Sequence, residues 1–177
     1  MAGRRRGVAV AAVAATLAAA GAADAVGEAQ SAFSLRSSAF RNGAAIPVVH
    51  TCEGRNVSPP LAWPSPPART RSLALLVDDP DAPRGTFTHW IAWGIGSSAR
   101  ALGQGKAPPG QGVNDAGRIG YLGPCPPPGD GAHRYVFRLY ALDTVLKLPR
   151  GAPRAAFQAA IRGHVLAVGR LVGIYER

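Results

Sequence analysis

Prolines and glycines divide this chain into short pieces after residue 40, and this feature constrains the fold more than any other. The 177 residues include 22 glycines and 16 prolines. Proline has no amide hydrogen to donate and breaks helices, and both residue types favour turns. An all-helical bundle is therefore excluded, and the pattern predicts one domain of many short elements joined by turns. With 47% hydrophobic and 17% charged residues, the chain is apolar enough to bury a core.

Apolar runs between these turns predict a mainly β fold. The run Ser72–Asp78 is continuous and of strand length, which predicts a central strand buried on both faces. Its predicted neighbours are Phe87–Ile95, rich in aromatic and β-branched residues, and Tyr135–Leu142, where apolar residues alternate. Edge strands are expected at Phe33–Leu35 and Ile46–Val49, and an extended segment at Asn56–Trp63.

One helix is predicted near the end of the chain. The segment 154–168 carries apolar residues at helical spacing on one face, namely Phe157, Ile161, Val165 and Val168. Pro153 suits the first turn of this helix, and Gly169 can end it before a last strand near Leu171–Tyr175. Residues 96–131 have little periodicity and predict a long ordered loop, of the kind that usually carries function.

The first 25 residues have the architecture of a secretory leader. Arg4–Arg6 precede the uncharged apolar run Val8–Ala20, and small residues follow at the spacing of a cleavage site. The run is short and weakly hydrophobic for a membrane span of about 20 residues. We therefore expect a signal peptide at residues 1–25, cleaved after export by the Sec or Tat route, rather than an uncleaved anchor. Residues 26–177 would then form one periplasmic or secreted domain.

Two cysteines, Cys52 and Cys125, are the only thiols of the chain. An exported protein could join them in a disulfide. There is no CxxC pair, and two thiols alone make a poor zinc site. The sequence leaves a disulfide and two free thiols equally open, because it does not supply the Cα separation of about 4.4–6.8 Å that a disulfide requires.

Carboxylates and histidines at the ends of predicted strands form the candidate site. Asp78, Asp79 and Asp81 follow the most hydrophobic strand, and the alternation of an extended chain puts Asp79 and Asp81 on one side and Asp78 on the other. His89 lies in the next strand, and His133 begins another. A carboxylate favours the cationic form of a neighbouring imidazole. With convergent backbone N–H groups, such a cation can hold a phosphate or a carboxylate.

Other interpretations of these residues stay open. Aspartates also cap turns, and a single buried histidine is often only a core residue. Together with Asp79, His89 and His133 could form a two-histidine-one-carboxylate metal site, or carry out acid–base or metal-assisted hydrolysis. No nucleophile is evident for such a reaction. His50 and His164 are expected to be structural.

The order of these motifs resembles the phosphatidylethanolamine-binding protein family, specifically its bacterial Raf kinase inhibitor-like branch. The resemblance runs from about Phe33 to Tyr175. It rests on blocks that occur in this order: Thr51–Trp63, Asp79–Pro83, His89–Trp90, Asn114–Asp115, Gly120–Tyr121, Gly123–Pro127, and His133–Tyr135 leading to Leu139–Leu142.

The resemblance implies a mainly β fold in which a large antiparallel sheet packs on a smaller sheet, with peripheral helices. It also implies a small anion pocket that needs no cofactor. The residues that would line the pocket are Asp79, Asp81, His89, Pro124, His133 and Tyr135. The Ala82–Pro83 bond is expected to be cis.

The residues and the resemblance together predict an exported, non-catalytic binding protein. Its ligand would be a phosphate-bearing small molecule or a phospholipid headgroup, and it could also act as an inhibitor or modulator of another protein. The alternative is a hydrolase that uses the same histidines and aspartates, with or without a metal. Basic residues are scattered, which argues against nucleic acid as a partner. Removal of Arg4–Arg6 and Asp24 lowers the net charge from +10 to +8, but without a basic amphipathic helix we expect at most peripheral membrane contact.

Overall fold

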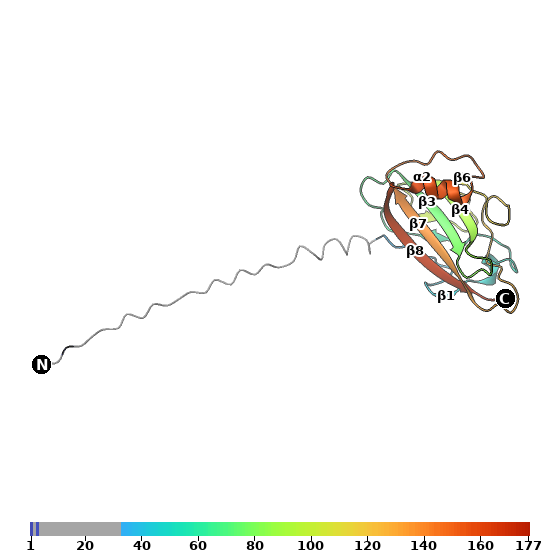
Figure 1. Ribbon diagram of the computed structural model, residues 1–177, viewed down its shortest axis with the longest axis horizontal. Coiled ribbons are helices and arrows are strands. Elements are labelled where there is room, and N and C mark those ends of the chain that lie inside the picture. The colour runs from blue at the N-terminus through green and yellow to red at the C-terminus, as the bar shows by residue number, and fades with distance from the viewer. Residues whose placement is uncertain (2, 4–32) are drawn as a thin grey trace.

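The computed structural model describes residues 1, 3 and 33–177. Apart from residues 1 and 3, the predicted leader lies outside the described residues, so the leader and its cleavage stay predictions. From residue 33 onward the chain forms a six-stranded sheet, a separate two-stranded sheet and few helices, which confirms the predicted mainly β fold (Figure 1).

The six-stranded sheet has the order β1-β8-β7-β3-β4-β6. Its strands are β1 (Ala44–Ala45), β3 (Ser72–Asp79), β4 (Phe87–Gly96), β6 (Gly110–Gln111), β7 (His133–Leu142) and β8 (Val165–Tyr175). All neighbours pair antiparallel except the short edge strand β1, which pairs parallel to β8. The predicted large sheet is therefore present, with one parallel pair at its edge.

The central strand β3 is buried along its whole length, as its continuous apolar run predicts. Its side chains alternate between two cores. Leu73, Leu75 and Val77 belong to one core, which also contains Leu61 and Trp63 from the segment of the two-stranded sheet. Successive side chains of a strand point to opposite faces, so the residues between them enter the second core. The two-stranded sheet consists of β2 (Leu61–Ala62) and β5 (Ala101–Leu102).

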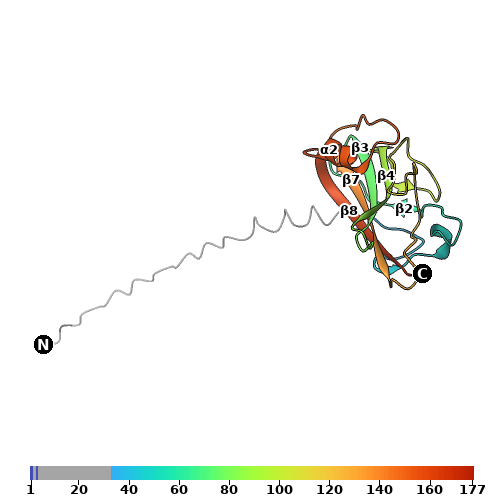
Figure 2. The same cartoon turned by 45° about the vertical axis from the view of Figure 1, so that its right-hand side comes forward.

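The second core lies under the helix α2 (Arg154–Ile161). Phe157 and Ile161 are its buried residues, and they join Leu76 of β3 and Trp93 of β4 in this core. Figures 1 and 2 show α2 near one end of the large sheet, beside β3. No helix among the described residues is long and apolar enough to cross a bilayer.

The helix is shorter than the sequence predicts. It ends at Ile161, Gly163 takes a φ of +79°, and β8 begins at Val165. Glycine adopts this left-handed conformation without strain and commonly ends helices. Val165 and Val168, predicted on the apolar face of the helix, are partly exposed residues of the strand. Antiparallel pairing with the full length of β7 outweighs the helical spacing of these two valines.

Two predicted edge strands are wrong. Phe33–Leu35 is not a strand, although the next residue, Arg36, forms an isolated bridge with Ala62. Instead of a strand at Ile46–Val49, the structure has β1 at Ala44–Ala45 and a 3₁₀ helix, η1 (Val48–His50), after Pro47. Proline lacks the hydrogen that a strand donates to its neighbour, so pairing stops there.

The expected cis bond at Ala82–Pro83 is also wrong, because the described residues contain no cis peptide bond. The trans form of an X–Pro bond is the more stable by about 0.5–1 kcal/mol.

Candidate functional site

A cavity of about 440 Å³ opens where three strands of the large sheet meet. Antiparallel pairing brings the end of β3 beside the starts of β4 and β7, with Asp78 opposite both Thr88 and Val136. Asp79, His89 and His133 reach the cavity from these three strands. The other lining residues are Ala82–Phe87, Asp115, Leu122 and Cys125–Pro127.

Asp79 and His133 form a buried pair in the cavity wall. Oδ2 of Asp79 lies 2.7 Å from Nδ1 of His133, and the two side chains are 4% and 3% exposed. Oδ2 of Asp130 lies 3.3 Å from the other ring nitrogen of His133. Burial alone would lower the pKa of His133, but hydrogen bonds and negative charge from Asp79 and Asp130 outweigh it and raise the pKa above its ordinary value. The site therefore favours the imidazolium form of His133.

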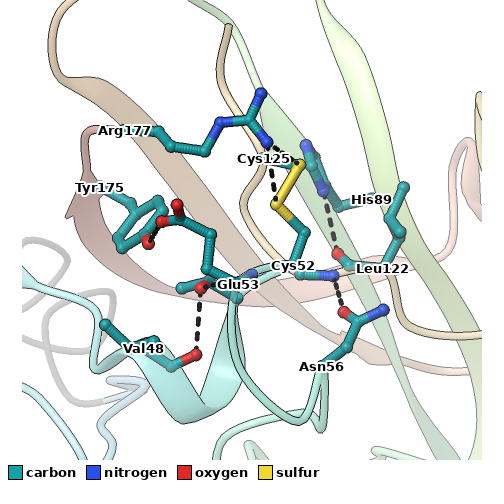
Figure 3. The surroundings of a disulfide bond; sticks show 11 residues. Val48, Cys52, Glu53, Asn56, His89, Leu122, Cys125, Tyr175 and Arg177 are labelled. Atoms are coloured by element: carbon teal, nitrogen blue, oxygen red, sulfur yellow. Dashed lines mark hydrogen bonds between the residues drawn. A yellow bond between two sulfur atoms is a disulfide. The ribbon is translucent and has the colours of Figure 1, made fainter. Parts of the chain in front are cut away.

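His89 is buried in a different environment. Its Nδ1 lies 2.9 Å from the Leu122 carbonyl oxygen, and since a carbonyl only accepts, Nδ1 carries the hydrogen (Figure 3). Burial lowers the pKa of His89, against the opposing effects of the Leu122 carbonyl and the Asp79 charge. His89 is thus neutral at neutral pH, and its Nε2 is a proton acceptor with no partner among the described residues.

A β-bulge sets the direction of His89. Val77 pairs with Trp90 and Asp78 pairs with Thr88, which leaves His89 as the extra residue between them. Bulges of this kind re-aim a side chain, often beside a functional site.

Tyr135 lies behind His89 rather than in the cavity lining. The two rings meet edge to face with centroids 5.1 Å apart. The Tyr135 hydroxyl is buried and has no hydrogen-bond partner among the described residues. Burial and the Asp79 charge raise the pKa of Tyr135, so this hydroxyl keeps its hydrogen.

Asp81 and Pro124, the two other predicted site residues, also lie outside the lining. Both carboxylate oxygens of Asp81 are occupied by Arg134, through Nη2 at 2.6 Å and Nε at 2.8 Å. The hydrogen bonds to Arg134 lower the pKa of Asp81 to about 2. The Asp81 amide donates to Oδ1 of Asp79 at 2.8 Å, so Asp81 positions Asp79. The Pro124 carbonyl accepts the Cys52 amide at 3.0 Å.

The sequence reasoning missed two charged residues of the cavity. Arg84 lines it from the turn after β3, and nothing in the local sequence distinguishes this arginine from the others. Asp115 lines it too, and its Oδ2 accepts the Thr88 amide at 2.6 Å. Asp115 belongs to a block that carries the family resemblance, which is a signal that could have found it. The cavity thus combines cationic and anionic groups.

Cys52 and Cys125 are joined in a disulfide with a Cα separation of 5.4 Å, which decides between the two states that the sequence leaves open. Nη1 of Arg177 lies 3.3 Å from the Cys125 sulfur and 3.7 Å from the Cys52 sulfur (Figure 3). Cys125 lines the cavity, so the disulfide ties one of its walls to the segment that contains Cys52.

A metal site does not assemble in this part of the chain. Among the described residues, no group of three or more His, Cys, Asp or Glu side chains is arranged to hold a metal ion. The Nδ1 atoms of His89 and His133 are both engaged by protein oxygens.

Asp78 lies away from the cavity, on the side predicted by alternation. Its Oδ2 is 2.9 Å from Arg154 Nη2 and 3.1 Å from Arg138 Nη1. Since Arg154 begins α2, this ion pair ties the helix to the sheet.

Of the histidines expected to be structural, His50 is buried, with Nδ1 2.9 Å from the Val57 carbonyl oxygen, and lies outside the cavity lining. His164 lies between α2 and β8, where its Nδ1 is 2.8 Å from Asp143.

Comparison with known proteins shows one family throughout. The sequence model of the family described as "Phosphatidylethanolamine-binding protein" matches residues 36–176. A UPF0098 protein of Methanothermobacter thermautotrophicus is 47% identical over 150 residues, which are 81% of this chain and 98% of that protein. A Mycobacterium tuberculosis protein named "Putative lipoprotein LppC" is 46% identical over 144 residues, 80% of this chain and 71% of that protein. The crystal structure of Escherichia coli YbcL, described as a member of the mammalian PEBP family, matches with a TM-score of 0.77 and 31% identity, over 82% of this chain and 99% of that chain.

Proposed function

The chain belongs to the phosphatidylethanolamine-binding protein family, and we propose that its cavity binds a phosphate group, carried by a small molecule or a phospholipid headgroup, without chemical turnover. The observation that carries this proposal is the pair of imidazoles in one cavity of about 440 Å³, with His133 favouring its cationic form and His89 neutral.

The charges of the cavity suit a zwitterionic ligand. Arg84 and the imidazolium form of His133 supply positive charge for the phosphate oxygens. Both ring nitrogens of His133 contact carboxylates, so its Nε2–H would donate to the phosphate in place of Asp130, which lies 3.3 Å away. Neutral His89 offers Nε2, which can accept the hydrogen of a monoanionic phosphate or take up a proton when a dianion binds. Asp115, also in the lining, faces the same space and can receive an ammonium group. Since Arg134 occupies Asp81, Asp115 is better placed than Asp81 for that role.

Binding is favoured over hydrolysis by the surroundings of the two histidines. A general base must lie within hydrogen-bond reach of the group that it activates. The side chains hydrogen-bonded to His133 are the carboxylates of Asp79 and Asp130, and His89 contacts the backbone carbonyl of Leu122. The sulfur of Cys125 is held in the disulfide. Among the described residues, neither imidazole is therefore hydrogen-bonded to a hydroxyl or thiol that it could activate.

We place this binding protein outside the cytoplasm, where its bound state would modulate another exported protein. The leader-like residues 1–25 support this location. The similarity to a mycobacterial protein named as a lipoprotein supports it as well.

The test is an NMR titration of the purified protein with inorganic phosphate and with phosphorylethanolamine. We expect saturable shifts of the His89 and His133 ring signals, with the rings of His50 and His164 unaffected. The variants His89→Ala and His133→Ala should each weaken binding at least about tenfold, the size of one hydrogen bond to a charged group. His164→Ala, which removes an imidazole outside the cavity, is the matched control.

The same experiment separates the alternatives. Release of inorganic phosphate from phosphorylethanolamine, seen by phosphorus NMR and abolished in both variants, would establish the hydrolase and overturn the proposal. Absence of shifts at millimolar ligand would also overturn it. Sedimentation with phosphatidylethanolamine vesicles then distinguishes the two ligand sources. A protein that binds the lipid headgroup should sediment with the vesicles in a way that depends on His89 and His133, whereas a protein that binds free phosphate compounds should not.

A further inference from the structure

A second cavity, of about 250 Å³, lies beside the first and shares no lining residue with it. Its wall comes from three loop segments and the β4–β6 side of the sheet. The lining residues are Asn56–Ser58, Trp90, Gly105–Ala107, Gln111 and Ile119–Tyr121.

Gln111 presents hydrogen-bond donors to this cavity. Its Oε1 accepts the indole N–H of Trp90 at 3.1 Å. Because an indole nitrogen only donates, this contact identifies the amide oxygen of Gln111 as the atom facing Trp90, and the amide nitrogen Nε2 as the atom on the other side of the group. Gln111 is only 8% exposed, and its Nε2 makes no hydrogen bond to another described residue. Among the described residues, the buried side-chain atoms that lack a partner do not include this Nε2, so the donor is open to the cavity, where a ligand or a water molecule can accept from it.

Two further side chains add to this set of donors. Ser58 lines the cavity and is 3% exposed, and its hydroxyl can donate one hydrogen bond. Oδ1 of Asn56 accepts the Gly123 amide at 2.6 Å, which turns its Nδ2 donors the other way (Figure 3). The neighbouring Gly120 keeps the amide of Gln111 unobstructed, since a Cβ there would lie 3.1 Å from Oε1.

The charge and the apolar surface of the cavity narrow the ligand class. Lys106 is the one charged side chain in the lining, and no acidic residue accompanies it. The rings of Trp90 and Tyr121 meet edge to face, with centroids 5.5 Å apart, and form an apolar wall. The Tyr121 hydroxyl donates a hydrogen bond to the His50 carbonyl at 2.7 Å, so Tyr121 contributes only its ring to contacts with a ligand. Ile119 adds exposed apolar surface at the edge.

We propose that this second cavity binds a carboxylate group carried on a short apolar body. One lysine balances one negative charge, whereas a phosphate dianion would call for more positive charge than the lining holds. Ser58, Gln111 and Asn56 donate to the carboxylate oxygens, and the aromatic wall receives the apolar part. The carboxylate belongs either to a free short-chain acid or to an acidic residue of a peptide.

The test uses butyrate and its uncharged analogue butyramide, followed by proton–nitrogen NMR. We expect butyrate to give saturable shifts at the Gln111 side-chain amide and at the backbone amides of Ser58 and Lys106. Butyramide should bind at least about tenfold more weakly, because it lacks the charge. Equal binding of the two compounds, or butyrate shifts confined to the first cavity, would overturn the proposal.

Variants keep the test independent of folding. Lys106→Gln changes an exposed side chain and should weaken butyrate binding about two- to fivefold, the size of a partly exposed ion pair. Lys147→Gln, at an exposed lysine outside both cavities, is the matched control and should change nothing. Ser58→Ala should weaken binding about tenfold. If Lys106→Gln and Ser58→Ala both bind like the wild type, the assignment of the cavity is wrong.

The source of the carboxylate is decided by two blocked amino acids. N-acetyl-glutamate amide carries the charge on a peptide-like unit, and N-acetyl-glutamine amide is its uncharged counterpart. Tighter binding of the first than of butyrate indicates a peptide residue, whereas the reverse order indicates a free acid.

Discussion

Breaking the bond between Cys52 and Cys125 should lower the free energy of unfolding by about 4 kcal/mol. The two cysteines are 73 residues apart in sequence. For a closed loop of that length, the loss of chain entropy in the unfolded state corresponds to about 4.4 kcal/mol at 25 °C. The folded state keeps its own contacts between these segments, because the Cys52 amide still donates to Pro124 and the Gly123 amide to Asn56. The effect should therefore arise almost entirely in the unfolded chain.

The assay is urea unfolding of three samples: oxidised wild type, wild type reduced with dithiothreitol, and the double variant Cys52→Ser/Cys125→Ser. The reduced wild type keeps both sulfur atoms, so its difference from the oxidised protein isolates the cross-link. We expect both uncrosslinked forms to remain folded, with lower midpoints and a slightly larger dependence on urea, because the unfolded chain expands. Dithiothreitol should not change the double variant, which serves as the control.

A loss below about 1 kcal/mol in both uncrosslinked forms would refute the entropic reasoning. Phosphate binding provides a second check on the same samples. Since the carbonyl of Leu122 that holds His89 lies in a segment still anchored by Asn56, we expect phosphate affinity to change little on reduction. Complete loss of binding in a folded, reduced protein would mean that the disulfide alone holds the cavity wall.

Three further predictions follow from the site and its supports. Asp79→Asn removes a carboxylate that raises the pKa of His133, so an NMR titration should show a lower pKa for His133 in the variant. The variant should also lose unfolding free energy. This loss should be largest below about pH 6.5 and should shrink as the pH rises through the raised pKa of His133 in the wild type. Sulfate keeps a constant charge over this pH range, so it should bind more tightly as the pH falls, because neutral His89 must gain a proton before it can donate to sulfate. A sulfate affinity that does not change with pH would contradict this prediction. Gly123→Ala should lower the free energy of unfolding by about 1–3 kcal/mol, because the added Cβ would lie 2.4 Å from a backbone oxygen. The control is Gly96→Ala, where the nearest atom to the added Cβ is 4.0 Å away, and it should lower the free energy of unfolding far less. Equal losses in the two variants would contradict the packing argument.

The strands that build the site are predictable because burial on both faces leaves a local signal. Ser72–Asp79 is continuously apolar up to its final aspartates, and every residue of this strand is buried. The end of the helix is not predictable in the same way. Val165 and Val168 fit a helical period as well as a strand, and only pairing with β7, more than twenty residues earlier in the chain, decides between them.

The chemistry of the site is predictable from residue types, whereas its geometry depends on contacts that a sequence does not display. Asp79, His89 and His133 do meet in one cavity, but His89 points there because a bulge leaves it unpaired against β3. Asp81 looks equivalent to Asp79 in the sequence, yet Arg134 occupies its carboxylate. Arg84 reaches the cavity from a turn with no distinguishing pattern.

The walls of the two cavities are held by one set of contacts between residues 50–58 and residues 120–125. Tyr121 donates to the carbonyl of His50, Gly123 donates to Asn56, and Cys52 is bonded to Cys125. Residues 120–125 give Leu122 and Cys125 to the first cavity and Tyr121 to the second, and residues 50–58 give Asn56 to the second.

A ligand that shifts these joined segments in one cavity would therefore change the affinity of the other. Linkage requires any such coupling to be reciprocal: the factor by which saturating butyrate changes phosphate affinity must equal the factor by which phosphate changes butyrate affinity. Asn56 contacts the wall segment of the first cavity while lining the second, so its contact with Gly123 is where the coupling would be transmitted. Two titrations with unequal factors could not both be reporting binding at these two cavities.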